Sequence, residues 1–221
     1  MNSTFKNIVA HTYKPLLVKY LSKTRKYRYK DISLSIAPDV FHPGFFFSTQ
    51  QLLQYVCKLP LQGKKFLELG CGSGLISITA AKKGAAVTAS DINPVAVEFL
   101  KKNSRENETA IEVIQSDLFF NIPKQAFDII AINPPYYKKH PLTVKDHAWF
   151  CGENGEYFLW LFDSLADYIT AGTEIYMILI EDCDMEMITG FARKNGFVFR
   201  CVHRKKNLLE KRFIFKIERA I

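Results

Sequence analysis

The stretch Lys65-Phe66-Leu67-Glu68-Leu69-Gly70-Cys71-Gly72-Ser73-Gly74-Leu75-Ile76 decides the fold of this chain. A short apolar run meets three glycines at alternate positions, and an apolar run then resumes at once. Glycine adopts backbone angles that are closed to residues with a Cβ atom, so the glycines predict a tight turn between a strand and a helix. The free N–H groups at the start of such a helix, and the positive end of its dipole, would face a ligand lying on the turn.

Three nucleotide-type ligands compete for a glycine-rich turn of this kind. A phosphate-binding loop ends in Gly-Lys-Ser/Thr, whereas Leu75 follows the last glycine here. A dinucleotide fingerprint has the spacing G-x-G-x-x-G, whereas these glycines are spaced G-x-G-x-G. Glu68 favours the third ligand, S-adenosylmethionine (SAM), because a carboxylate suits a cationic amine and SAM carries an ammonium group but no phosphate. A strand–helix turn without any ligand would also fit this stretch taken alone.

A second motif, Asn133-Pro134-Pro135-Tyr136, follows the apolar run at 127–132. The two prolines cannot continue a strand ladder and restrict the residues before them, so the backbone is stiff where it leaves the predicted strand. In an open parallel sheet, the carboxyl ends of the strands face the ligand crevice. We therefore expect Asn133 and the glycine turn to open onto the same crevice.

The Asn-Pro-Pro-Tyr segment suits transfer of a methyl group to a planar nitrogen. An amide NH2 or the exocyclic amine of a base is a poor nucleophile because its lone pair is delocalised. The Asn133 side-chain oxygen and the Pro134 carbonyl can each accept one N–H bond, which fixes the nitrogen and favours the positive charge developing on it. The Tyr136 ring can stack on the flat group. The sequence thus predicts Asn133, Pro134 and Tyr136 as catalytic residues, although a turn that merely ends a strand would read the same way.

Strand and helix patterns alternate along most of the chain, which predicts a parallel sheet. Asp91 ends a predicted strand 17 positions after Gly74, where a ribose-binding carboxylate belongs, and Asp117 follows the next strand and could accept a bond from an adenine amino group. Further strands are expected at 86–91, 111–116, 127–133, 174–180, 197–202 and 211–217. Helices are expected at 75–83, 153–168 and 185–194. A helix should also begin at Pro94, with Asn93 as its cap. Another helix should begin after Ser48 or Thr49 as its cap, and 137–152 should form a long irregular loop over the crevice.

The positive charge of the chain is concentrated at its start. Residues 1–30 hold eight of the 30 Lys and Arg residues and no acid, which leaves 22 basic residues to match the 22 Asp and Glu residues elsewhere. Tyrosines at 13, 20, 27 and 29 interleave with these charges, as they do on surfaces that stack nucleic-acid bases. The segment predicts either a polyanionic partner, RNA or the ribosome, or a solvated basic face with tyrosines packed on the core. We expect helix at 3–23, either kinked or divided into two short helices at Pro15, and a hairpin turning near Lys30-Asp31.

Cysteine and hydropathy patterns bear on location and cofactors. The five cysteines include no Cys-x-x-Cys pair, which predicts reduced thiols in a cytoplasmic protein. No run of 18 apolar residues and no signal-peptide pattern occurs, so no membrane segment is expected. The five histidines are scattered, and we expect loop or surface roles for them and no metal site. The oligomeric state stays open, and a monomer is compatible with the sequence.

These motifs resemble those of class I SAM-dependent methyltransferases. Glu68-x-Gly70-x-Gly72-x-Gly74 is similar to the first motif of that class, and the resemblance covers about residues 40–219. It implies an α/β, Rossmann-like fold with a seven-stranded, mostly parallel sheet whose last strand is antiparallel. Residues 40–221 would form the SAM-dependent methyltransferase domain, and residues 1–39 a small basic N-terminal extension of helix and hairpin.

More narrowly, the chain resembles the HemK-type glutamine-N5 methyltransferases and the related "methyltransferase small" family. The segments that carry this resemblance are Asp91-Ile92-Asn93-Pro94 and residues 148–155. The resemblance implies SAM as cofactor, S-adenosylhomocysteine as product, and a protein glutamine, as in a release-factor-like substrate, as acceptor. An exocyclic amine of an rRNA or tRNA base (N6 of adenine or N2 of guanine) and a non-catalytic SAM-binding module are the alternatives. The residues expected to line the cofactor site are Thr49, Glu68, Gly70, Gly72, Gly74, Asp91, Ile92, Asp117 and Asn133.

Overall fold

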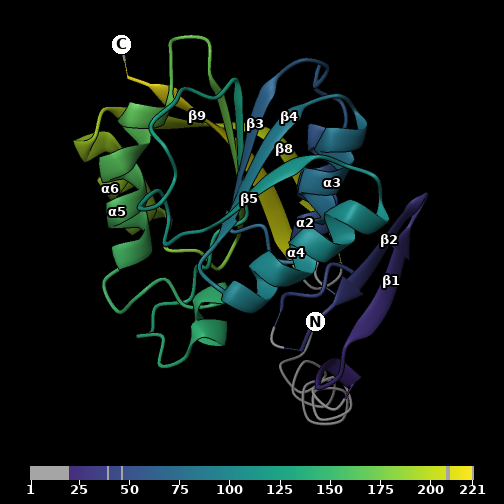
Figure 1. The fold of residues 1–221 in the computed structure, drawn as a ribbon. Coiled ribbons are helices and arrows are strands. Elements are labelled where there is room, and N and C mark those ends of the chain that lie inside the picture. Colours follow the sequence, from purple (N-terminus) through teal and green to yellow (C-terminus); the bar gives the residue numbers. More distant parts are fainter. Residues whose placement is uncertain (1–19, 39, 46, 208–209, 221) are drawn as a thin grey trace.

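The computed structural model of the chain describes residues 20–38, 40–45, 47–207 and 210–220. These residues form a two-stranded hairpin and a seven-stranded sheet with helices on both faces (Figure 1). The helix expected at 3–23 lies, except for its last few residues, outside the described part of the chain.

The large sheet has the strand order β5-β4-β3-β6-β7-β9-β8. All neighbours are parallel except β9, which runs antiparallel to both β7 and β8. A short connection joins β8 to β9, and such a connection can only bring strands together antiparallel because a parallel pair needs a crossover. The predicted sheet, with its last strand antiparallel, is confirmed. Its strands are β3 (Lys65–Leu69), β4 (Ala86–Asp91), β5 (Ile111–Gln115), β6 (Ile129–Ile132), β7 (Glu174–Ile180), β8 (Phe197–Lys206) and β9 (Lys211–Arg219).

Two hydrophobic cores lie on opposite faces of the sheet. Alternate residues of a strand point to opposite faces, so Phe66 of β3 enters one core and Leu67 and Leu69 enter the other. The first core includes buried residues of α2 (Phe47–Val56), α3 (Leu75–Lys82) and α4 (Pro94–Glu106). The second includes buried residues of α5 (Glu156–Leu165) and α6 (Met185–Lys194).

Local signals set several of the helix ends, and some predicted ends are corrected. Asn93 caps α4 by accepting from the Val95 N–H over 2.9 Å, with Pro94 at the first helical position as predicted. The helix expected at 153–168 begins only at Glu156, because Gly155 has a φ of 79°, and it closes with a 3-10 turn at Ala166–Tyr168. The prediction that Ser48 or Thr49 precedes the next helix as its cap is wrong, since α2 already begins at Phe47.

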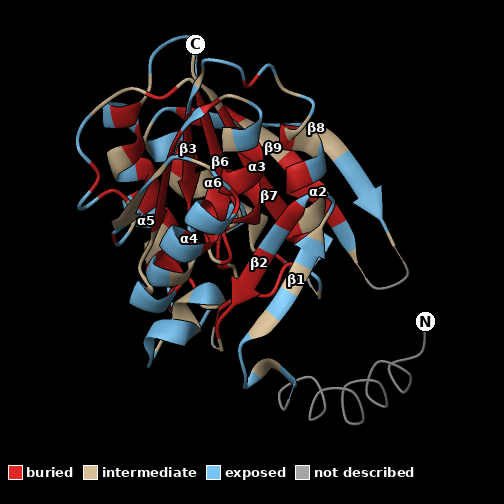
Figure 2. Cartoon of the chain, turned by 45° about the vertical axis from the view of Figure 1, so that its right-hand side comes forward, coloured by how far each residue is buried: buried red, intermediate tan, exposed pale blue. Residues whose placement is uncertain are grey.

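The hairpin of β1 (Arg25–Tyr29) and β2 (Ile32–Ile36) packs on the first core, as the buried colour of β2 in Figure 2 shows. The free edge of β2 is paired by two asparagines one turn apart, Asn103 in α4 and Asn107 at its C-cap. Asn103 Oδ1 accepts from Ser35 N over 2.8 Å and Asn107 Oδ1 from Ser33 N over 3.0 Å, and each side-chain amide donates back to the carbonyl of the same serine. Every buried polar group of this contact is therefore satisfied.

Candidate active site

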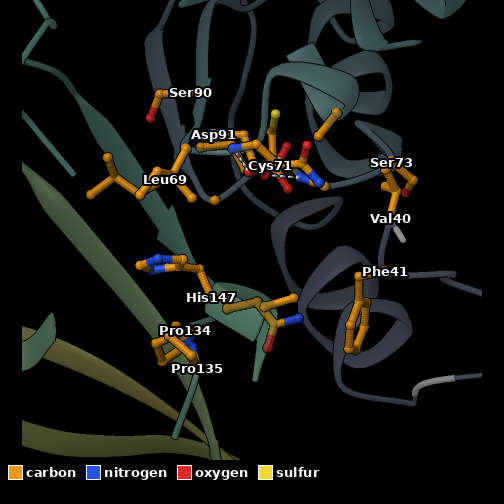
Figure 3. Close-up of a pocket in the computed structure, with 18 of the residues that line it drawn as sticks. Val40, Phe41, Leu69, Cys71, Ser73, Ser90, Asp91, Pro134, Pro135 and His147 are labelled. Atoms are coloured by element: carbon orange, nitrogen blue, oxygen red, sulfur yellow. Dashed lines mark hydrogen bonds between the residues drawn. The ribbon is translucent and has the colours of Figure 1, made fainter. Parts of the chain in front are cut away.

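A pocket lies at the carboxyl ends of β3, β4 and β6, as expected for an open parallel sheet. Figure 3 shows Asp91 and Cys71 on one side of it and Pro134 and Pro135 on another. All predicted site residues except Gly74 line this pocket, namely Thr49, Glu68, Gly70, Gly72, Asp91, Ile92, Asp117, Asn133, Pro134 and Tyr136. Segments up to 87 residues apart in the sequence thus meet around one cavity.

The glycine turn after β3 requires the left-handed backbone that glycine tolerates. Gly70, Gly72 and Gly74 have φ values of 73°, 48° and 77°. Gly74 does not line the pocket but is the N-cap residue of α3, where a Cβ atom would clash with the side chain of Leu100. Gly74 is therefore needed for packing of α3 against α4, whereas Gly70 and Gly72 expose main chain to the pocket.

Glu68 lies in β3, is buried, lines the pocket and directs its carboxylate to the first turn of α3. Its Oε2 atom accepts from Ser77 N over 2.8 Å and from the Ser77 hydroxyl. A carboxylate is stabilised at this end of a helix dipole. Burial nevertheless raises the pKa of Glu68 to about 8, despite the Ser77 bonds that lower it, and the charge of Asp91 adds to the rise.

Asp91 links the end of β4 to the glycine turn. Its Oδ2 accepts from Gly72 N over 2.8 Å, and its Oδ1 accepts from Asn93 N over 2.9 Å. Burial raises the pKa of this carboxyl too, although these backbone bonds and the nearby His147 oppose the rise. The pocket thus holds two carboxyls that lack a cationic partner strong enough to offset their burial, which favours a ligand with positive charge.

Asn133 is held by the first turn of α2. Its side-chain NH2 donates to Ser48 Oγ over 3.4 Å and to Thr49 Oγ1 over 3.3 Å. Both hydroxyls therefore belong to residues within α2 that line the pocket, and their observed partner is Asn133. Because the NH2 group is turned towards α2, the side-chain oxygen of Asn133 stays available to accept a bond from another molecule.

Tyr136 and the chain after it form the neighbouring wall. The Tyr136 ring lies 4.8 Å from that of Tyr137, and burial raises the pKa of the Tyr136 hydroxyl well above its usual range. Tyr137 is tied to the far end of the long loop, since its N–H donates to the Trp149 carbonyl and its carbonyl accepts from Cys151 N, each over 3.0 Å. The expected irregular loop at 137–152 is therefore closed at its base.

That loop brings pocket residues which the sequence motifs did not predict. A 3-10 helix at Val144–Ala148, with a capping box of Thr143 and Asp146, places His147 in the pocket. The Trp149 ring packs 5.2 Å from Phe41, which comes from the turn before α2. Neither Phe41 nor His147 belongs to a motif, and only the tertiary fold brings them to the pocket.

The structure shows neither a metal-ion site nor a membrane-spanning helix among the residues that it describes. Among residues 20–38, 40–45, 47–207 and 210–220, no group of three or more His, Cys, Asp and Glu side chains is arranged to hold a metal ion. No helix in the part of the chain that the structure describes is long and apolar enough to cross a membrane.

Relatives in sequence carry methyltransferase names. The chain is 41% identical over 106 residues to a protein of Methanocaldococcus jannaschii provisionally named a protein N5-glutamine methyltransferase, covering 48% of this chain and 51% of that one. It is 34% identical over 126 residues to ribosomal RNA small subunit methyltransferase C of Hamiltonella defensa, covering 56% and 37%. The chain thus spans about half the length, or less, of these curated relatives.

Solved structures share the fold. The 16S rRNA N2 G1207 methyltransferase of T. thermophilus, in complex with AdoMet (SAM) and guanosine, has a TM-score of 0.64 at 19% identity, covering 89% of this chain and 50% of that one. Mtq2 of E. cuniculi, in its complex with Trm112, has a TM-score of 0.63 at 22% identity, covering 82% and 99%. These likenesses confirm the Rossmann-like methyltransferase architecture.

The family match covers the glycine turn, Asp91 and the Asn-Pro-Pro-Tyr segment. It extends over residues 32–150, more than half of the 221 residues. The predicted methyltransferase class, with SAM as its cofactor, is thereby confirmed at the level of the family. The chain belongs to the methyltransferase small domain family.

Proposed function

We propose that the protein transfers the methyl group of SAM to a planar amide or amine nitrogen. One observation carries the proposal: Asn133-Pro134-Pro135-Tyr136 opens into the same pocket as the glycine turn and Asp91, with the Asn133 oxygen free to accept. A pocket that held only a cofactor would not need this polar segment beside it.

The charges of the pocket support SAM on the side of the glycine turn. Glu68 and Asp91 both have raised pKa values, so a cationic ligand would stabilise their ionised forms. Bound SAM would supply an electrophilic methyl group on a positively charged sulfur. We assign Glu68 to the methionine end, Asp91 to the ribose hydroxyls and Asp117 to the adenine amino group, with Gly70 and Gly72 against the ligand.

The acceptor nitrogen would lie between Asn133 and Tyr136. The Asn133 oxygen and the Pro134 carbonyl would each accept an N–H bond, which orients the nitrogen towards the methyl group and stabilises the positive charge that forms on it. The Tyr136 ring would stack on the flat group. No strong base is required beforehand, because the proton can leave after transfer.

A protein glutamine, as in a release-factor-like protein, is our first choice of acceptor. It is supported by the relative named for N5-glutamine methylation and by the resemblance to HemK-type enzymes. An exocyclic amine of an RNA base is the second candidate, because β1 presents Lys26 and Arg28 to solvent beside other basic residues of the N-terminal segment. We further propose that residues 1–39 form a separate N-terminal extension and that the protein acts in the cytoplasm.

Label transfer would test the proposal. The protein is incubated with methyl-labelled SAM and a cell extract, and the label is followed into protein and RNA fractions. We expect label in one fraction, and transfer that is about 10²- to 10³-fold slower with Asn133→Ala, which retains SAM binding. Label in protein supports glutamine, label in RNA supports the base amine, and label in neither fraction would overturn the assignment.

A further inference from the structure

Arg212 is a buried cation on the acceptor side of the site. It lies near the start of β9, next to the carboxyl end of β7, and its side chain is only 3% exposed. Its Nε donates to Gln51 Oε1 over 2.9 Å, and its Nη1 donates to Glu210 Oε1 over 2.7 Å. The guanidinium carbon also lies 5.1 Å from the centre of the Phe47 ring.

A buried arginine of this kind contributes little net stability. Removing a guanidinium from water is costly, and a buried ion pair is often no more stable than apolar residues of similar volume. Arginine differs from such residues because its planar fork holds several partners in fixed directions. The partners of Arg212 therefore indicate what it holds in place.

The first partner leads to Asn133. Gln51 lies in α2 immediately after the turn that carries Ser48 and Thr49, the two hydroxyls that accept from the Asn133 amide. Gln51 is buried, and its amide also reaches the Arg212 carbonyl over 3.5 Å. Arg212 thus fixes the rotation of α2 that brings Ser48 and Thr49 to Asn133.

The second partner leads to Tyr136. Burial and the neighbouring Tyr137 raise the pKa of the Tyr136 hydroxyl, and the charge of Glu210 adds to the rise, so Glu210 interacts with Tyr136 electrostatically. The Glu210 side chain is 28% exposed, so Arg212 anchors a carboxylate that still reaches solvent. Arg212 is thus linked to the acceptor half by a hydrogen bond to Gln51 of α2, and by charge alone through Glu210.

We propose that Arg212 is a positioning residue for the acceptor half of the site. It acts through Gln51 and α2 on the orientation of the Asn133 amide, and it contacts neither cofactor nor acceptor itself. The inference rests on the proposed function, in which the Asn133 oxygen holds the acceptor nitrogen. Neither Arg212 nor Gln51 lines the pocket, so the cofactor half should not depend on them.

Replacement of Arg212 by methionine tests this inference. Because displacing a reacting group by about 1 Å can cost on the order of 100-fold, we expect kcat of Arg212→Met to fall roughly 10- to 100-fold, with SAM affinity measured by calorimetry unchanged. Lys216→Met is the matched control, since it removes another β9 cation, paired with Glu174 over 2.7 Å at the opposite end of β7. The assays are run well below the melting temperatures of both variants.

Gln51 keeps the inference testable if Arg212→Met does not fold. Gln51→Leu should lower kcat like Arg212→Met, and Gln51→Glu, which retains an acceptor for Nε, should recover most of the loss. If Arg212→Met and Gln51→Leu keep the turnover of the parent, as Lys216→Met should, while Asn133→Ala loses it, the positioning role alone is overturned. If Asn133→Ala also retains turnover, the proposed function itself fails.

Discussion

The side chain of Asn133 donates to Thr49 Oγ1 over 3.3 Å, which joins two residues 84 positions apart at the junction of β6 and α2. The contact turns the NH2 group of the amide towards α2, in a residue that lines the pocket, and leaves the side-chain oxygen as the group that can accept from a ligand. A side chain with this orientation can accept a hydrogen bond from an acceptor nitrogen but need not touch the cofactor.

Asn133→Ala should therefore separate chemistry from cofactor binding. Loss of one preorganised transition-state contact costs about 10²- to 10³-fold in rate, so we expect turnover to fall by that factor while SAM binds nearly as before. Single-turnover label transfer and calorimetry measure the two effects. Parental turnover in this variant would show that the amide has only a structural role.

Asp91→Ala should weaken cofactor binding. Hydrogen bonds to a charged group contribute on the order of 1.5–3 kcal/mol, and the substitution also removes the acceptor of the Gly72 and Asn93 N–H groups. We expect the SAM dissociation constant to rise accordingly in calorimetry. Lys124→Ala, which removes an exposed ion pair with Asp167, provides a control. An unchanged dissociation constant for Asp91→Ala would refute its assignment to the ribose.

Glu68 should make both stability and SAM binding depend on pH. Its pKa is raised from 4.5 to about 8 in the folded protein, so the folded state binds the proton more tightly than the unfolded state. The free energy of unfolding should then fall as pH rises from about 4.5 to 8. A cationic ligand favours the ionised carboxylate, so SAM affinity should rise over the same range.

Glu68→Gln provides the comparison for both pH effects. The glutamine retains an oxygen that can accept from Ser77 but does not titrate. Thermal melting and calorimetry across pH 5–9 should show a shallower dependence in the variant, with the remainder due to Asp91, whose pKa is also raised. Identical pH profiles for the two proteins would contradict the role given to Glu68.

Gly74→Ala should be more destabilising than Gly63→Ala. Both glycines have a positive φ, 77° and 72°, so both substitutions carry the strain of a left-handed residue, about 1–2 kcal/mol. Only at Gly74 would the new methyl group meet a buried side chain, that of Leu100, and overpacking adds typically 1–3 kcal/mol. Urea unfolding compares the two, and equal losses would rule out the Leu100 contact as the reason for glycine.

Charge reversal on β1 tests the polyanion hypothesis. Lys26 and Arg28 are exposed, whereas Arg25 stacks 3.9 Å over the Tyr20 ring, so Lys26→Glu/Arg28→Glu is the cleaner variant. Each phosphate contact contributes a slope of about −0.7 in log K against log salt on single strands. The variant should bind RNA more weakly and with a flatter slope, while SAM affinity is unchanged.

The control for that reversal lies on α6. Arg193→Glu/Lys194→Glu changes the net charge by the same amount on two exposed residues across the sheet. Filter-binding titrations of the two variants separate a local docking surface from a general effect of charge. Equal retention of RNA by the parent and the β1 variant would leave protein glutamine as the acceptor we favour.

Elements with local signals could be predicted from the amino-acid sequence. Glycines at alternate positions predicted the turn after β3, Asn93-Pro94 predicted the start of α4, and the prolines after Asn133 predicted where β6 ends. Glycine and proline act on the conformation of their own backbone, so their effect can be predicted without knowledge of distant residues. Because parallel strands present their carboxyl ends at one edge, the same motifs also predicted a common pocket.

The tertiary structure alone decided which distant side chains surround those motifs. The sequence predicted Ser48 or Thr49 as a helix cap, yet both lie within α2 and accept from the distant Asn133. Phe41, His147 and Arg212 occur in no motif. Loops bring Phe41 and His147 to the pocket, and strand pairing places Arg212 behind it, against Gln51. The direction of a side chain depends on the packing of whole elements, and that packing is set by the two cores together rather than by any one segment.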